Sequence, residues 1–237
     1  MAEDEHRMND LDRRVNIKQE YIFVWRDDTN PDLPVSTNGH HMSRQYTPTS
    51  VSATSFQVPI KLYDTGKFTK LARQWTLETT VEWLGPFLPG HGDWLKKSSF
   101  LQCYAAGTGI APFIRIIQSL LDEDVCDLRV QLVYCVRSEK DVLFKELIDK
   151  WTKHWNFTVH VVTSSPEKPT TLPYLAQVHP GSRLKEEIFH SLLTTFCNPD
   201  HDGLRLAVCG SKSFEKDVIN FARRDGLPDG QIFRFPG

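Results

Sequence analysis

The chain has 237 residues, of which 40% are hydrophobic and 24% are charged, a balance typical of a globular protein with one large domain or two small ones. Its 28 basic and 30 acidic residues give a formal net charge of -2, which argues against general nucleic-acid binding. The 5 cysteines lack the spacing of a disulfide framework or a metal site, and no apolar run reaches membrane-spanning length, so we expect a reducing, cytoplasmic location, no integral membrane segment and no metal site.

The first 92 residues predict a mainly antiparallel β domain. Residues 1–14 are charged and almost free of apolar side chains, so we expect a mobile tail there and a domain over residues 15–92. Strands are predicted where β-branched and aromatic residues gather, at Val15–Ile17, Tyr21–Trp25, Phe56–Tyr63 and Thr79–Leu84. A short helix is predicted between Gly66 and Trp75, and Gly85 with Pro86 is expected to end the last strand.

From residue 93 to residue 237 predicted strands alternate with predicted helices. The strands are Phe100–Ala105, Arg129–Val136, Phe157–Thr163, Leu204–Cys209 and Gln231–Phe235. The helices are Pro112–Leu121, Leu143–Trp151, Leu184–Thr195 and Phe214–Arg224, and a long loop is expected over Ser164–Pro180. This alternation implies a doubly wound parallel sheet, which binds ligands at the carboxyl ends of its strands.

A glycine turn follows the first of these strands. Gly107 and Gly109 interrupt the apolar run, Thr108 supplies a hydroxyl, and Pro112 suits the first turn of the following helix. A helix start behind a glycine turn is suited to a phosphate or another electron-rich group. The alternative is an ordinary strand–helix turn without a ligand, and the turn alone does not decide between them.

Three other segments hold side chains or backbone groups suited to a ligand, and each also has an ordinary structural explanation. Arg44, Tyr46, Thr47 and Ser50 gather a cation, a phenol and two hydroxyls, which suit a phosphate but also a polar strand end. The tetrad Gly66-Lys67-Phe68-Thr69 presents backbone N–H groups to an anion or forms a plain helix cap. Cys209, before Gly210, is a small core residue or a neighbour of a redox cofactor. We expect no thiol catalysis, because no His/Asp partner pattern accompanies this cysteine.

Taken in order, these segments resemble the NADH–cytochrome b5 reductase family, within the ferredoxin–NADP reductase superfamily, over about Tyr21–Phe235. The motifs that carry the resemblance are Arg44–Ser50 (flavin motif Arg-x-Tyr-Thr/Ser), Gly66–Thr69 (Gly-Lys-Met-Ser), Gly107–Pro112 (nicotinamide motif Gly-Thr-Gly-Ile-Thr-Pro), Val136–Asp141 (the segment after the second Rossmann-like strand) and Cys209–Gly210 (start of Cys-Gly-Pro-Pro). The resemblance implies a small, shortened antiparallel β-barrel that binds FAD, followed by a doubly wound parallel α/β domain that binds the nicotinamide coenzyme.

The resemblance also assigns residues to roles. It places Thr47, Thr108 and Cys209 at the reacting atoms, with Arg44 on the FAD pyrophosphate and Tyr46 against the flavin. The cofactor-binding residues that it implies are Arg44, Tyr46, Thr47, Ser50, Gly66, Lys67, Phe68, Thr69, Gly107, Thr108, Gly109, Arg137 and Gly210. Arg137 and Ser138 follow the second strand of the α/β domain, where a coenzyme 2′-phosphate binds in such proteins, so NADPH stays open beside NADH.

The implied function is an FAD-dependent oxidoreductase. It passes a hydride from NADH to flavin N5, and then electrons to an acceptor such as the haem of cytochrome b5. The chain departs from the family pattern at three places: the segment before Arg44 is short, Ala111 replaces the second threonine, and Cys209-Gly210 continues as Ser211-Lys212. The short segment before Arg44 implies a shortened barrel and supports an alternative, a degenerate, flavin-free relative that binds a nucleotide or a partner protein.

Overall fold

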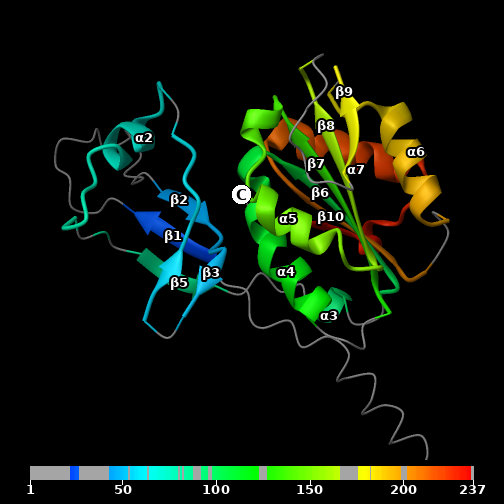
Figure 1. Cartoon of the computed structure of the whole chain (residues 1–237), viewed down its shortest axis with the longest axis horizontal. Helices are drawn as coiled ribbons and strands as arrows, with labels where there is room; N and C mark the ends of the chain where they lie inside the picture. The colour runs from blue at the N-terminus through cyan, green and yellow to red at the C-terminus, as the bar shows by residue number, and fades with distance from the viewer. Residues whose placement is uncertain are drawn as a thin grey trace, which may run out of the picture. The chain divides into compact units, whose positions relative to one another are not determined.

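The computed structural model of the chain describes residues 22–26, 43–52, 54–62, 64–79, 81, 83–87, 92–95, 98–122, 127–165, 176–181, 183–198 and 202–235 (Figure 1). The chain divides into two compact units, one of residues 19–89 and one of residues 90–236. The expected tail over residues 1–14 and the expected strand at Val15–Ile17 lie outside the described residues.

The unit of residues 19–89 is antiparallel. Strands β1 (Ile22–Arg26), β2 (Ser43–Tyr46) and β5 (Trp83–Phe87) form a sheet in the order β2-β1-β5, and β3 (Ser50–Val51) pairs with β4 (Phe56–Gln57). Helix α2 (Lys67–Ala72) begins after Gly66, as predicted. Aromatic rings form the interior: Phe68 lies 5.6 Å from Tyr46 and 5.7 Å from Trp75 between ring centroids, and Trp83 lies 5.8 Å from Tyr46.

Two strand predictions in this unit are wrong in extent. The alternating segment Phe56–Tyr63 pairs as a strand only over Phe56–Gln57. Strand β5 does not stop at Gly85 but runs through Pro86 to Phe87. It can do so because β5 is the edge of its sheet and its register with β1 shifts between Ile22 and Val24, so that the proline needs no ladder partner at this point.

The unit of residues 90–236 is the predicted parallel α/β domain. Its sheet has the order β11-β10-β6-β7-β8-β9, and every neighbouring pair is parallel. The strands are β6 (Phe100–Ala106), β7 (Arg129–Val136), β8 (Phe157–Thr163), β9 (Gln177–Pro180), β10 (Leu204–Cys209) and β11 (Ile232–Arg234). The α-helices are α3 (Gly92–Leu95), α4 (Ala111–Asp122), α5 (Lys145–Trp151), α6 (Glu186–Phe196) and α7 (Lys212–Arg224), and the short 3₁₀ helices are η1 (Gly107–Ile110), η2 (Glu139–Asp141) and η3 (Asp229–Gln231). The fold class is therefore confirmed.

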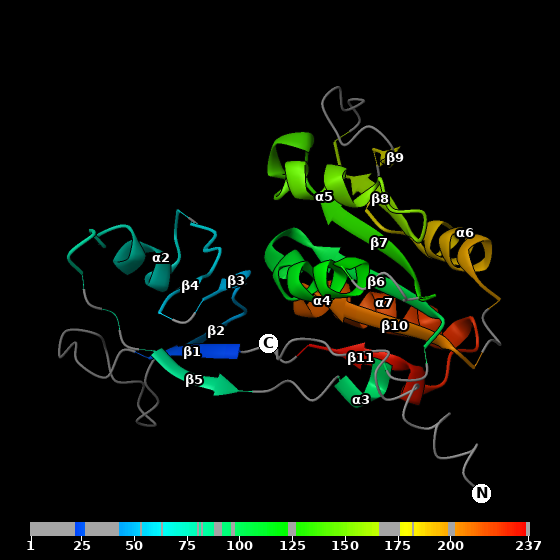
Figure 2. The same cartoon turned by 60° about the horizontal axis from the view of Figure 1, so that its bottom comes forward.

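Helices cover both faces of the parallel sheet, with α4 and α5 on one face and α6 and α7 on the other (Figures 1 and 2). The side chains of each strand alternate between these faces. In β6, Cys103 packs with the α4 and α5 residues, whereas Tyr104 packs with those of α6 and α7 and stacks on Phe189 at 4.9 Å between centroids. Burial on both faces explains why the central strands are near-continuous apolar runs.

The order of the strands indicates where in this sheet a ligand would bind. The chain moves outward from β6 through β7 and β8 to β9 and then returns to β10 on the other side of β6. The strand order thus reverses between β6 and β10, and doubly wound sheets bind ligands outside the carboxyl ends of the strands at such a point. The turns Gly107–Gly109 and Cys209–Gly210 follow these two strands.

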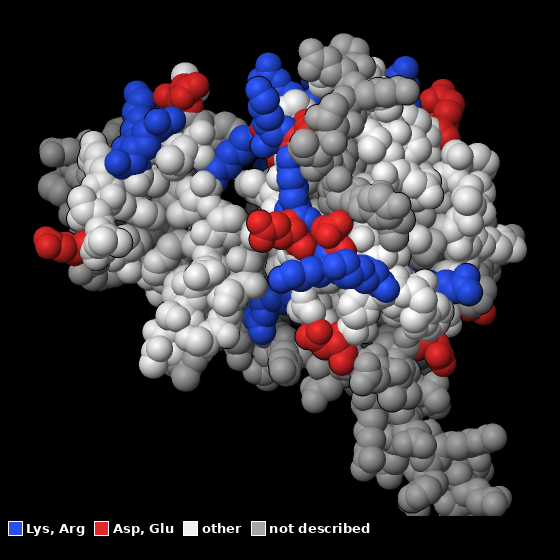
Figure 3. Space-filling view, viewed as in Figure 1, with Lys and Arg blue, Asp and Glu red and all other residues white. Residues whose placement is uncertain are grey.

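Charged side chains of both signs lie side by side on the face drawn in Figure 3. Among the described residues of that face, basic groups are interspersed with acidic ones, in keeping with the near balance of charge in the whole chain. Within the described ranges, none of the helices has both the length and the apolar character needed to cross a membrane.

A row of hydrogen-bonded polar side chains, one from each of four neighbouring strands, crosses the face of the sheet that α6 and α7 cover. The Gln102 amide donates to the Gln131 carbonyl oxygen, and the Gln131 amide lies 3.2 Å from His160 Nε2. His160 Nδ1 lies 3.2 Å from His179 Nε2 on edge strand β9. Burial, reinforced by the neighbouring His179, lowers the pKa of His160 to about 4. His160 is therefore neutral at pH 7 and is held by hydrogen bonds rather than by charge.

This histidine makes the stability of the chain depend on pH. The unfolded chain binds a proton at His160 below about pH 6.5, whereas the folded chain binds it only below about pH 4. Stability therefore falls as the pH drops through this window, by about 2 kcal/mol between pH 7 and pH 5. Urea unfolding at both pH values should show this loss, and His160→Gln should remove the part that His160 contributes, leaving the part that comes from the lowered pKa of the buried His179. His154→Gln, at an exposed position after α5, is the control and should keep the wild-type dependence. An equal pH dependence in all three proteins would contradict the assignment.

Candidate functional site

Two backbone turns meet at the point where the strand order reverses. Gly107 adopts φ +55°, and an added Cβ there would meet no atom within 4 Å, so the turn opens onto free space. Gly109 is the opposite case. An added Cβ would lie 2.3 Å from the carbonyl oxygen and 2.6 Å from the carbonyl carbon of Cys209. The two glycine turns that the sequence singled out are therefore packed backbone against backbone.

Tyr134 of β7 supports the first turn. Its hydroxyl donates to the Gly107 carbonyl oxygen at 3.0 Å and accepts from the Leu143 N–H at 3.4 Å. Burial raises the pKa of this phenol, so the hydroxyl stays protonated and keeps its role as a donor. Sequence reasoning missed Tyr134, because a tyrosine inside an apolar strand looks like an ordinary core residue.

The second turn carries a protonated thiol. Cys209 is half-buried, and burial, with a smaller contribution from the Glu215 carboxylate, raises its thiol pKa to about 12. A thiol with this pKa is not a nucleophile at neutral pH. Gly210 is also tightly packed, because an added Cβ would lie 2.7 Å from Phe214 Cδ1 and 2.9 Å from the Ala106 Cβ. The arrangement suits a small, uncharged side chain that borders a ligand.

A pocket of about 590 Å³ lies at the carboxyl ends of β7 and β8, lined by Arg137, Ser138, Lys140, Asp141, Ser164 and Ser165. Asp141 accepts from the Ser138 N–H at 3.1 Å and from its hydroxyl at 2.8 Å. The Ser165 N–H donates to the Arg137 carbonyl oxygen at 2.9 Å and so ties the two strand ends together. Basic and hydroxyl side chains in one open pocket suit an anionic, hydroxyl-bearing ligand.

The residues that the resemblance assigns to FAD lie in the other unit. Tyr46 is half-buried and packs on Phe68, and Phe68 and Thr69 are the buried residues of α2. Thr47 is half-buried, whereas Lys67 and Ser50 are exposed. Ser50 pairs with Gln57 in the β3–β4 ladder rather than joining the aromatic group. The backbone of Arg44 lies in β2, opposite Trp25, and its side chain is outside the described part of the structure.

The contacts therefore gather the predicted residues into two sets. One set joins Tyr46 to Phe68, and the other joins Gly109 to Cys209 and Gly210. Arg137 lies at the end of β7, two strands from β10 in the sheet order. Among the described residues, no group of three or more His, Cys, Asp or Glu side chains is arranged to hold a metal ion.

Known proteins resemble this chain in sequence. The profile of the family "Oxidoreductase NAD-binding domain" matches residues 104–220. The chain is 33% identical over 205 residues to an NADH-cytochrome b5 reductase-like protein of Mus musculus, an alignment that covers 84% of this chain and 62% of that protein. It is 30% identical over 201 residues to the protein of the same description in Homo sapiens, covering 82% and 61%. The chain thus spans about three fifths of the length of these relatives.

Solved structures share the fold at low sequence identity. The cytochrome b5 reductase domain of Ulva prolifera nitrate reductase matches with a TM-score of 0.68 at 17% identity, over 91% of this chain and 84% of that chain. A ferredoxin NADP+ reductase from Neisseria gonorrhoeae, with bound FAD and NADP, matches with a TM-score of 0.64 at 20% identity, over 91% and 84%. At these identities the likeness concerns the fold alone.

The parallel unit thus matches the profile of an oxidoreductase NAD-binding domain over most of its length, and its two glycine turns lie at the point where doubly wound sheets bind ligands. The relatives narrow this class: over more than four fifths of its length the chain is similar to proteins described as NADH-cytochrome b5 reductase-like.

Proposed function

We propose that the chain is an FAD-dependent oxidoreductase that takes a hydride from NADH and passes electrons to an acceptor such as the haem of cytochrome b5. The observation that carries the proposal is the backbone contact between Gly109 and Cys209, which brings two family motifs together at the carboxyl ends of β6 and β10. The free thiols of Cys103, Cys135, Cys197 and Cys209 fit the reducing, cytoplasmic location that we propose for it.

The residues of the parallel unit fit a nicotinamide coenzyme. Gly107 leaves open space above its Cα, as the approach of a ligand to the backbone requires. Thr108 supplies a hydroxyl at this turn, and Cys209 supplies an uncharged thiol at the other turn. The pocket at Arg137 and Ser138 would hold the adenosine end of the coenzyme. These residues bind and orient the coenzyme, whose nicotinamide ring supplies the hydride chemistry.

The residues of the antiparallel unit fit FAD less completely. Tyr46 presents an aromatic ring with a polar tip, and its packing on Phe68 would hold that ring in place against a flavin. In this proposal Arg44 binds the pyrophosphate, with Ser50, Gly66, Lys67 and Thr69 as further contacts, and Thr47 lies at flavin N5. FAD supplies the redox chemistry when bound, and these residues supply its position.

The colour of the purified protein tests this function. A flavoprotein of this kind should be yellow, or become yellow when FAD is added, and it should bleach when NADH is added without oxygen. Cytochrome b5 added afterwards should be reduced. A colourless protein that does not take up added FAD would favour the flavin-free alternative, which the short segment before Arg44 supports.

We propose NADH as the preferred coenzyme, with Arg137 as the residue that lets NADPH bind. Its neighbouring carboxylates have other partners: Glu139 lies 3.8 Å from Lys145, and Asp141 accepts from Ser138. A charge-assisted hydrogen bond contributes roughly 1.5–3 kcal/mol, so Arg137→Ala should lower kcat/KM for NADPH about tenfold or more. The value for NADH should change little, because NADH has no 2′-phosphate.

The control for this variant is Arg129→Ala. Arg129 is an exposed arginine of the same strand, at its opposite, amino end. Its removal should leave both coenzymes unaffected. A wild-type protein that prefers NADPH would overturn the choice of NADH, and equal losses for both coenzymes in Arg137→Ala would overturn the role of Arg137.

A further inference from the structure

We propose that Glu215 is a positioning residue that holds the Cys209–Gly210 turn against Gly109 and so sets where the nicotinamide ring lies. The inference rests on the proposed function, since it deepens the account of the same site. Glu215 lies in the first turn of α7, and the resemblance assigned it no role.

The carboxylate of Glu215 bridges two segments. It is buried, with only 3% of the residue exposed. Its Oε1 accepts from the Gly210 N–H at 3.1 Å, and its Oε2 accepts from Arg234 Nε at 2.7 Å. Arg234 belongs to β11 and pairs with Val208, the residue before Cys209. The turn is thus tied through one side chain both to α7 and to the last strand of the sheet.

The Gly210 N–H needs this partner. It follows the last residue of β10, where the ladder with β6 ends at Cys209 and Ala105. An amide at such a place costs free energy unless an acceptor satisfies it. A carboxylate is a strong acceptor for it, and the negative charge is further stabilised by Arg234 and by its place in the first turn of a helix.

The geometry links this carboxylate to the site itself. A Cβ added to Gly109 would lie 3.0 Å from Gly210 Cα, so Gly210 takes part in the same backbone contact as the Cys209 carbonyl group. Any displacement of Gly210 therefore moves the surface on which the Gly107–Gly109 turn rests. The raised pKa of the Cys209 thiol agrees with this placement, because the Glu215 charge contributes to it.

The first experiment needs no cofactor and uses the full chain with Glu215→Gln. Glutamine has the same shape but no charge, and its one carbonyl oxygen can accept from only one of the two donors; the charged Arg234 takes that oxygen, so the NH2 group faces the Gly210 N–H and leaves it without an acceptor. Hydrogen exchange at the Gly210 amide should become about tenfold faster or more. Alkylation of Cys209 by iodoacetamide, followed by peptide mapping, should become several-fold faster, because removal of the carboxylate lowers the thiol pKa. Unchanged exchange and alkylation would overturn the proposal.

The second experiment measures flavin reduction by NADH in the same variant. The rate at saturating NADH should fall about tenfold or more, with FAD content unchanged and a smaller change in KM, because misplaced reactants lower kcat. A looser turn with a wild-type rate would overturn the positioning role. If the wild type itself neither holds FAD nor oxidises NADH, the proposed function fails, and exchange and alkylation still decide whether Glu215 holds the turn.

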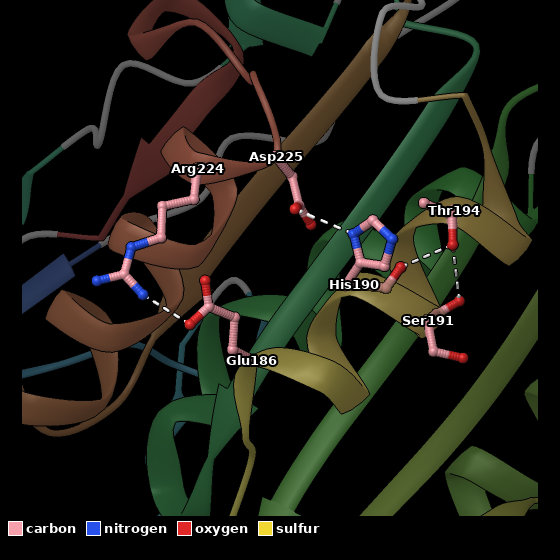
Figure 4. A network of polar contacts seen from close by, with 6 residues as sticks. All are labelled: Glu186, His190, Ser191, Thr194, Arg224 and Asp225. Atoms are coloured by element: carbon pink, nitrogen blue, oxygen red, sulfur yellow. Dashed lines mark hydrogen bonds and ion pairs between the residues drawn. The ribbon is translucent and has the colours of Figure 1, made fainter.

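The matched control is Glu186→Gln. Glu186 also pairs with an arginine, its Oε2 accepting from Arg224 Nη1 of α7 at 2.6 Å, in a polar network that includes His190 and Asp225 (Figure 4). This variant loses an ion pair of the same helix away from the turn and should match the wild type in both experiments. If Glu215→Gln does not fold, Arg234→Gln, at a half-exposed side chain, should shift exchange and rate in the same direction by a smaller factor.

Discussion

Replacing Gly109 by alanine is expected to lower the rate of flavin reduction by NADH about a hundredfold. The new Cβ would lie 2.3 Å from the carbonyl oxygen of Cys209, a backbone atom that cannot rotate away. The Cys209–Gly210 segment is held in turn by Glu215, so one of the two turns must shift by about 1 Å, and a misplacement of that size costs about a hundredfold in rate. Stopped-flow measurement of flavin bleaching would record this change.

Alanine variants at two other glycines distinguish the effect of a steric clash from the effect of backbone strain. Gly107→Ala meets no atom within 4 Å but must adopt φ +55°, which costs about 1–3 kcal/mol in stability for a residue with a side chain. Gly230→Ala also meets no atom within 4 Å and has no positive φ, so it should behave as the wild type. FAD content should stay unchanged in all three variants, because the proposed FAD-binding residues lie within positions 44–69. A rate for Gly109→Ala equal to that of Gly230→Ala would contradict the importance of the contact.

The buried strands could be predicted from the sequence because burial on two faces leaves a plain pattern. Arg129–Val136, Phe157–Thr163 and Leu204–Cys209 are strands over the predicted residues. The edge strand β9 could not be found in the same way. It is short, partly exposed and ends in Pro180, and its pairing with β8 is a tertiary contact that its own residues do not indicate.

The glycines of the candidate site could be predicted from the sequence, but the side chains that hold the glycine turns in place could not. Gly107 and Gly109 interrupt an apolar run and so stand out, whereas Tyr134 is hidden within such a run. Glu215 did leave a signal. The buried positions of α7 are Glu215, Val218 and Ala222, so a carboxylate occupies the apolar stripe of an amphipathic helix. A charge at a buried helical position needs a partner, so the pattern of α7 indicates that Glu215 contacts a hydrogen-bond donor of a neighbouring segment.

Replacing Arg44 by alanine is expected to yield a protein that folds but purifies largely without flavin. In the proposed site Arg44 binds the FAD pyrophosphate, for which arginine supplies a fixed, always charged fork. The loss of one charge-assisted hydrogen bond, roughly 1.5–3 kcal/mol, should weaken FAD binding by about one to two powers of ten. The ratio of flavin to protein absorbance in the purified variant measures the effect, and titration with FAD gives the change in affinity.

The same unit offers a control arginine. Arg73 Nη2 lies 3.2 Å from Asp64 Oδ1, with side chains 49% and 99% exposed, and such surface pairs contribute about 0–1 kcal/mol. Arg73→Ala should therefore keep its flavin. Excess FAD should restore part of the activity of Arg44→Ala, because the contact of Gly109 with Cys209 is untouched by this substitution. If Arg44→Ala retains flavin at the wild-type ratio, Arg44 does not bind the pyrophosphate, and the match of Arg44–Ser50 to the flavin motif is wrong.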